Sequence, residues 1–179
     1  MANYAPSTRA RIADLITGMH VKTTDGGLAA AEFTDTAQTE LFTVVGRIAV
    51  RQLFIEITSA ADVNATQVLF NCTFTTPVIA VNAMCAKCAS IANAAAHTRI
   101  TFVGGAVATA AVITDSAGLT DVETANKIHI IGGETAAGAN TVGTIGMLGD
   151  DATQAGTISA TAHLFYFPMS NGAYAEALV

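Results

Sequence analysis

The chain has 179 residues, of which 8 are Lys or Arg and 14 are Asp or Glu, so its formal net charge is −6 at pH 7. Hydrophobic residues make up 51 % of the chain and charged residues only 12 %, with a mean hydropathy of +0.48. This composition excludes a disordered acidic chain, and without a basic cluster we expect no nucleic-acid partner.

The sequence carries no pattern typical of a membrane span or a secretion signal. The charge-free run between Arg99 and Asp115 is too short and too polar to cross a bilayer. The N-terminus lacks a basic segment followed by an apolar one. We therefore expect no membrane partner and synthesis in the cytoplasm, where the three cysteines stay reduced.

The first predicted element is a short amphipathic helix near the N-terminus. Ser7 or Thr8 can cap it, and Gly18 and the turn at residues 25–27 close it. We expect residues 1–36 to form an arm that docks on a neighbouring molecule rather than on the domain's own core. The apolar residues that fall at helical spacing make the expected contact: Ile12, Leu15, Ile16 and Met19.

From Leu41 the apolar residues repeat at every second position, which predicts a single β domain with a C-terminal tail over residues 37–179. After Arg51 and Gln52 the apolar phase slips by one residue. A regular strand cannot keep both halves facing one core after such a slip. We therefore predict a β-bulge or bend there, at which the chain passes between sheets.

Further strands are expected at short intervals, each ended by turn residues. Gly104 and Gly105 predict a hairpin between two of them, whereas the Ala-rich stretch 86–96 fits either a short helix or a loop. Many short strands without intervening helices predict an all-β fold, an antiparallel β-sandwich or barrel of jelly-roll-like form. The expected strands are 68–74, 78–84, 100–103, 107–113, 128–131, 145–148 and 158–166.

Cys85 and Cys88 have the spacing of a zinc knuckle or of a dithiol redox site. Zinc needs two more ligands, and only Cys72 and His97 are near in sequence, without forming a second close pair. We favour two small buried side chains, because free cysteine is among the most buried residue types. A metal or thiol role for the pair stays open as an alternative.

The other polar residues form no catalytic or ligand pattern. The histidines at 20, 97, 129 and 163 are isolated, so we expect surface or interface positions for them. Asp150 and Asp151 fit a solvated turn, and no serine lies in a nucleophile elbow. We accordingly expect no enzyme activity, no cofactor and no metal.

Two segments of the chain resemble small virion proteins of tailed bacteriophages. One is residues 46–58, which read GRIAVRQLFIEIT, and the other is the closing strand from Gly156 through Tyr166 and Pro168 to Gly172. They bracket a middle rich in Ala, Gly and Thr, so the resemblance covers roughly residues 40 to 172. The pair of cysteines at 85 and 88 departs from the pattern.

The resemblance implies a capsid decoration (cement) protein that lies on the virion surface and stabilises the phage head by binding the major capsid protein. It also implies a homotrimer, because decoration proteins commonly occupy three-fold positions of icosahedral shells. The nearly neutral stretch 63–114 independently favours a subunit whose surface is covered by partners. A tail or head–tail component is the alternative within this class. A carbohydrate-binding sandwich, using an aromatic cluster of Phe165, Tyr166 and Phe167, is a further alternative.

Overall fold

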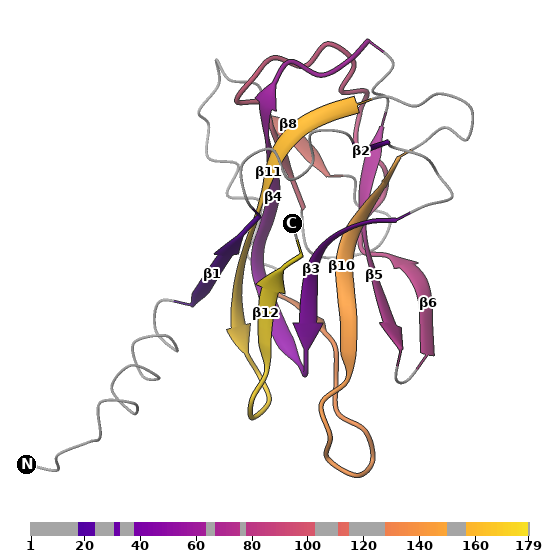
Figure 1. The fold of residues 1–179 in the computed structure, drawn as a ribbon, viewed down its shortest axis with the longest axis vertical. Coiled ribbons are helices and arrows are strands. Elements are labelled where there is room, and N and C mark those ends of the chain that lie inside the picture. The colour runs from indigo at the N-terminus through magenta and orange to yellow at the C-terminus, as the bar shows by residue number, and fades with distance from the viewer. Residues whose placement is uncertain are drawn as a thin grey trace, which may run out of the picture.

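The computed structural model describes residues 18–23, 31–32, 38–63, 67–75, 78–102, 111–114, 128–149 and 157–178. Within these residues the chain forms strands and no helix. The strands make two antiparallel sheets that face each other (Figure 1). The all-β antiparallel prediction is confirmed in its sandwich form, whereas the barrel alternative is wrong because both sheets are open.

The seven-stranded sheet is built around its two longest strands, β4 (Ile48–Ser59) and β11 (Thr157–Pro168), which are neighbours although they lie far apart in sequence. Two short strands, β2 (Ala31–Glu32) and β9 (His129–Ile131), pair with the ends of β11 and β4. The main order is β1 (Met19–Lys22), β11 (Thr157–Pro168), β4 (Ile48–Ser59), β7 (Arg99–Thr101) and β8 (Val112–Thr114).

The five-stranded sheet mixes strands from both ends and from the middle of the chain. Its edge strand β12 lies beside β3 in Figure 1. The order is β12 (Tyr174–Ala177), β3 (Thr39–Val45), β10 (Val142–Gly149), β5 (Val68–Thr75) and β6 (Val78–Ala83).

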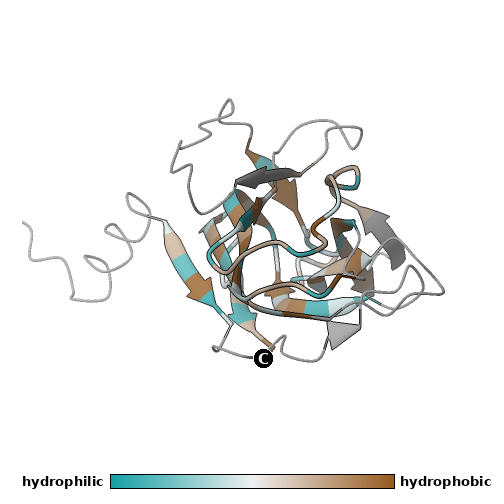
Figure 2. Cartoon of the chain, turned by 90° about the horizontal axis from the view of Figure 1, so that it is seen from above, coloured by the Kyte–Doolittle hydropathy of each residue, from teal (hydrophilic) through white to brown (hydrophobic). Residues whose placement is uncertain are grey.

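The hydrophobic core lies between the sheets, because each strand turns alternate side chains inward. Alternation of hydrophobic and hydrophilic residues is visible along β1 in Figure 2. Full burial of a large aliphatic or aromatic side chain contributes roughly 1.5–3 kcal/mol. The largest fully buried side chains are Tyr166, Phe42, Phe70, Leu41, Ile48, Leu53, Ile55, Ile57, Met84, Ile91 and Ile100.

The phase slip at Arg51 and Gln52 is a β-bulge inside one continuous strand. Gln52 is opposite Phe165 and Val50 is opposite Tyr166, so Arg51 has no partner in β11. The extra residue returns Leu53 to the face of Val50, and both are buried. The predicted bulge is therefore confirmed, but the predicted passage between sheets is wrong because β4 stays paired with β11 on both sides of the bulge.

Met19 corrects the predicted N-terminal arm. It belongs to β1, where it is opposite Tyr166, and its half-buried side chain packs against the domain's own core. Met19 therefore does not end a helix, since the pairing with β11 extends its backbone. Because β1 and β2 both pair with β11, the β domain begins before the boundary predicted at residue 37. Ile12, Leu15 and Ile16 lie outside the described residues.

The remaining predicted strands occur near their expected places. The structure also decides whether residues 86–96 form a helix or a loop. β7 and β8 are antiparallel neighbours, as a hairpin requires, while Gly104 and Gly105 lie outside the described residues. The Ala-rich stretch 86–96 is a loop with turns rather than a helix. Asn93 in this loop has a φ of 57°, a left-handed conformation that Asn tolerates better than most residues.

Candidate functional site

Four rings gather on the outer face of the seven-stranded sheet, and we call them the ring cluster: His20, Phe165, His163 and Phe54. Strand register brings them together, since His20 is opposite Phe165 and His163 is opposite Phe54. The His20 and Phe165 rings stack at 4.2 Å and 11°, and the His163 and Phe54 rings at 4.6 Å and 12°. In each of these two pairs, one face of each ring is thus covered by the other ring.

His20 and His163 meet through their ring nitrogens. Nε2 of His20 lies 3.2 Å from Nδ1 of His163, within hydrogen-bond distance. Their planes differ by only 2° and their centres are 5.5 Å apart. That separation is close to the nitrogen–nitrogen distance plus two ring radii, so the rings lie end to end in nearly one plane. One N–H therefore donates to the other ring's nitrogen, and the two nitrogens share a single proton.

Glu56 is the acidic neighbour of the ring cluster. Its carboxylate lies 3.2 Å from Nδ1 of His97 and accepts a hydrogen bond from Nε of Arg99 at 3.3 Å. Burial raises the pKa of Glu56, but the hydrogen bond to His97 and the charge of Arg99 outweigh it and leave the pKa below its ordinary value. The Arg99 guanidinium also lies 5.4 Å from the Phe54 ring centre, a cation–π contact.

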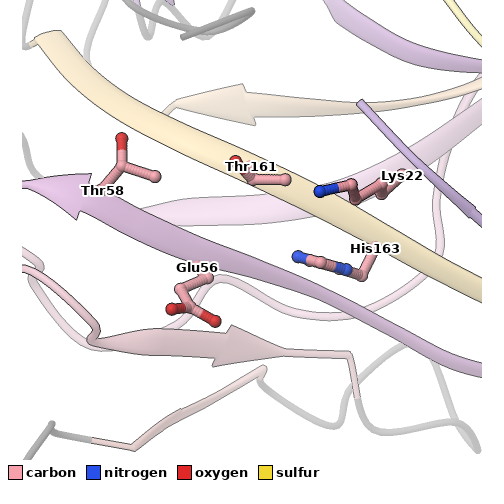
Figure 3. A pocket seen from close by; sticks show the side chains of 5 residues that line it. All are labelled: Lys22, Glu56, Thr58, Thr161 and His163. Carbon is pink, nitrogen blue, oxygen red and sulfur yellow. The ribbon is translucent and has the colours of Figure 1, made fainter. Parts of the chain in front are cut away.

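A shallow cavity of about 380 Å³ opens beside the ring cluster. Lys22, Thr161 and His163 line one part of it, and Glu56 and Thr58 line the other (Figure 3). Hydroxyl, ammonium, imidazole and carboxylate groups therefore surround a space open to solvent. Such a set of groups can hold a small polar molecule, or the polar side chains of a docked protein.

The two cysteines at 85 and 88 follow β6 and lie along the first residues of β5, beyond the part that pairs with β6, where they complete its hydrogen bonding. The backbone N–H of Phe70 donates to Sγ of Cys85, and that of Val68 donates to Sγ of Cys88, both at 3.3 Å. Burial raises the pKa of both thiols. A buried, protonated thiol is a poor nucleophile and a poor metal ligand. The predicted burial is confirmed, and the geometry gives both cysteines a structural role.

His129 is half-buried, and Tyr166 does not have the exposed position that the carbohydrate-binding alternative needs. The His129 ring packs edge-on against Phe102 with centres 5.4 Å apart, and burial lowers its pKa. Tyr166 is fully buried, and its hydroxyl bonds to the backbone of Ala175. The sugar platform suggested by Phe165, Tyr166 and Phe167 therefore loses its middle member, while Phe165 is stacked on His20.

Large apolar side chains are exposed on both sheets. On β9 and just before it, Ile130 and Ile128 are 55 % and 60 % exposed. On the five-stranded sheet, Val142 and Tyr174 are 46 % and 42 % exposed, and both are opposite Val45. The two groups lie on different sheets, so the sandwich presents apolar residues on two of its faces. Exposed apolar residues of this size mark surfaces suited to contact with other proteins.

Comparison with protein-family models, curated proteins and solved structures finds no match to this chain. Within the described ranges, no group of three or more His, Cys, Asp and Glu side chains is placed to hold a metal ion. The same part of the chain contains no helix long and apolar enough to cross a membrane. The ring cluster was not predicted from the sequence, because strand register rather than sequence spacing assembles it.

Proposed function

We propose that this chain is a structural subunit of a tailed bacteriophage virion, a decoration protein that binds the major capsid protein on the outside of the head. The observation that carries the proposal is the pair of exposed apolar surfaces on different sheets, around Ile130 and around Tyr174. A subunit that is contacted by the shell and by its own copies needs two such surfaces.

The two segments that resemble phage virion proteins support this proposal through their place in the fold. Residues 46–58 coincide with most of β4, and residues 156–172 contain β11. These two strands are direct neighbours at the centre of the seven-stranded sheet. The resemblance therefore follows a contiguous structural unit rather than two unrelated stretches of alternating sequence.

The distribution of charge supports a ring of identical subunits, for which we propose a homotrimer. The strands of the seven-stranded sheet carry three cations, Lys22, Arg51 and Arg99, against two acids, Glu32 and Glu56. The strands of the five-stranded sheet carry Glu40 and Glu176 and neither Lys nor Arg. The two sheets thus differ in the sign of their net charge, which suits a heterologous contact, and such contacts close into rings when the rotation between subunits allows it.

The proposal is tested by adding the purified full chain to expanded shells of the major capsid protein from the same phage genome. We expect co-sedimentation with the shells, and a native mass three times 18.2 kDa. Ile130→Lys should lower the bound amount, because it places a charge in an apolar contact. Val63→Lys is the matched control, since Val63 is 64 % exposed in a loop outside the sheets.

Two results would contradict the proposal. One is a monomer that does not bind shells at any protein concentration. The other is detection of the chain in purified tails but not in purified heads, which would favour the tail or head–tail alternative. Equal shell binding by both lysine variants would show that the apolar surface around Ile130 is not part of the contact with the shell.

A further inference from the structure

The edge strand β1 is held to the sheet by few interactions. It pairs with β11 over the four residues from Met19 to Lys22. Just beyond it, the N–H of Thr23 donates to the carbonyl oxygen of Ala162 at 3.0 Å, and the Thr23 hydroxyl accepts from the N–H of Ala162 at 2.9 Å. A short edge strand of this kind opens at a smaller free-energy cost than the central strands.

The His20–His163 pair is a side-chain contact across this junction that can change with pH. In its neutral form one N–H donates to the facing nitrogen at 3.2 Å. A first added proton binds a nitrogen that points away from the pair, and the hydrogen bond persists. A second added proton puts an N–H on both facing nitrogens, so the hydrogen bond is lost and two imidazolium ions face each other.

The charged groups around the pair do not neutralise a second imidazolium. From β1, Lys22 is opposite His163 and adds positive charge. From β7, Arg99 is a second cation, and from β4, Glu56 is the carboxylate that faces the pair. Glu56 already binds Arg99 and also His97, which lies in the loop before β7. The doubly protonated pair would therefore face two cations and one shared anion.

We propose that the His20–His163 pair is a proton-operated latch, in which uptake of a second proton releases β1 from the edge of β11. Release separates the two imidazolium ions and lets water solvate both of them. The central pairing of β4 with β11 does not involve this contact and stays closed. The latch thus detaches the N-terminal strand without unfolding the sandwich.

The direction of the pH effect follows from the surroundings of His163. Burial, followed by the charge of His20, lowers the pKa of His163 below its ordinary value of 6.5. The released strand restores the solvated environment and binds the proton more tightly. Release of β1 is therefore opposed at pH values above the ordinary histidine pKa of 6.5, and it becomes progressively easier as the pH falls below 6.5.

The test is amide hydrogen exchange of the full chain at about pH 7.5 and about pH 5.5, expressed as protection factors so that the intrinsic pH dependence cancels. The reporter is the Thr23 amide, which is bonded to Ala162 in the closed state. We expect its protection to fall by up to about tenfold at the lower pH, because a pH of about 5.5 lies one unit below the ordinary pKa of histidine and one pKa unit corresponds to a factor of ten. The Ile57 amide, bonded to Thr98, should keep its protection.

Two variants distinguish release of β1 by the His20–His163 pair from other effects of low pH on the protein. His20→Phe keeps a ring against Phe165 but cannot take a proton, so it should clearly reduce the pH dependence of the Thr23 protection and leave only the part that comes from the burial of His163. His97→Gln is the matched control, because His97 contacts Glu56 and lies outside the pair, and it should retain the wild-type response. If His20→Phe alters the closed strand, His163→Phe repeats the test from β11.

The latch is overturned if Thr23 has the same protection at both pH values. It is equally overturned if Thr23 and Ile57 lose protection together, because that outcome is global unfolding. A full pH response in both phenylalanine variants would also overturn it, since the response would then arise elsewhere.

Discussion

The hydroxyl of Tyr166, in the seven-stranded sheet, accepts a hydrogen bond at 2.9 Å from the backbone N–H of Ala175, in the five-stranded sheet. The contact joins the two sheets beside the edge strand β12, which within the described residues has β3 as its one sheet partner. A single buried side chain thus ties the last strand of one sheet to the other sheet.

Replacing Tyr166 by Phe should therefore destabilise the protein while leaving its core shape unchanged. The variant leaves the Ala175 N–H without its partner in a buried place, which costs about 1–3 kcal/mol. Urea unfolding should report this loss. Phe165→Leu, a change on the outer face, should leave the protection of the Ala175 amide against hydrogen exchange intact, whereas Tyr166→Phe should reduce it.

The cysteine pair gives a second prediction, based on the hydrogen bonds that the sulfurs accept. Cys85→Ala should cost about 1–3 kcal/mol more than Cys72→Ala, because only the former leaves a buried N–H, that of Phe70, unpaired. Cys72 is the matched control, as a buried thiol for which the described residues provide no hydrogen-bond partner. Equal losses in urea unfolding would contradict the structural role, and so would a zinc-dependent rise in Tm.

Gly132 and Gly138 offer a test of close backbone packing. Both have a positive φ, 75° and 78°, which costs other residues about 1–2 kcal/mol. A Cβ at Gly132 would lie 2.0 Å from the carbonyl oxygen of Gly46, whereas nothing lies within 4 Å of one at Gly138. Gly138→Ala should therefore show only the conformational cost, and Gly132→Ala a clearly larger loss of unfolding free energy. Similar losses would contradict the close approach.

The bulge in β4 predicts that one deletion is tolerated. Arg51 has no partner in β11, so its removal should leave a regular ladder in which Val50 and Leu53 both still face the core. Deleting Glu56 instead should turn the fully buried Ile57, the next residue, away from the core, because side chains alternate along a strand. We expect the first variant to give the far-ultraviolet circular dichroism of a folded β protein and the second to be unfolded. A folded Glu56 deletion would refute this interpretation.

His129 should contribute to the pH dependence of stability. Burial lowers its pKa below the ordinary value of 6.5, so the folded protein binds this proton more weakly than the unfolded chain does. Stability is then fully present above that value and falls as the pH decreases below it. His129→Phe should lose less unfolding free energy between about pH 7.5 and about pH 5.5 than the wild type does. An unchanged pH dependence would contradict the prediction.

The sequence predicted the long strands well, because one face of each is buried. Alternation along β4 and β11 is set by the core, and the slip at Arg51 is visible since every following apolar residue changes phase. Met19 shows the opposite case. Four residues of alternation in β1 are too few to outweigh the helical spacing that precedes them, and pairing with β11 decides the outcome.

The ring cluster could not be predicted for a related reason. His20, Phe54 and His163 belong to three strands, and their contact depends on strand order and register. Nothing in the local sequence around one of these residues encodes its partners. The burial of the two cysteines at 85 and 88 was easier to predict, because most free thiols are buried. Their hydrogen bonds to β5 could not be predicted, because they depend on the fold.

The position of β11 between β1 and β4 has a consequence for how the protein is made. Val50 and Tyr166 are partners although more than a hundred residues separate them in the chain. A nascent polypeptide leaving the ribosome therefore exposes the edges of β1 and β4 until β11 has been synthesised. Most of the core must close late and over long loops, which favours slow folding and makes the unfinished chain a substrate for chaperones.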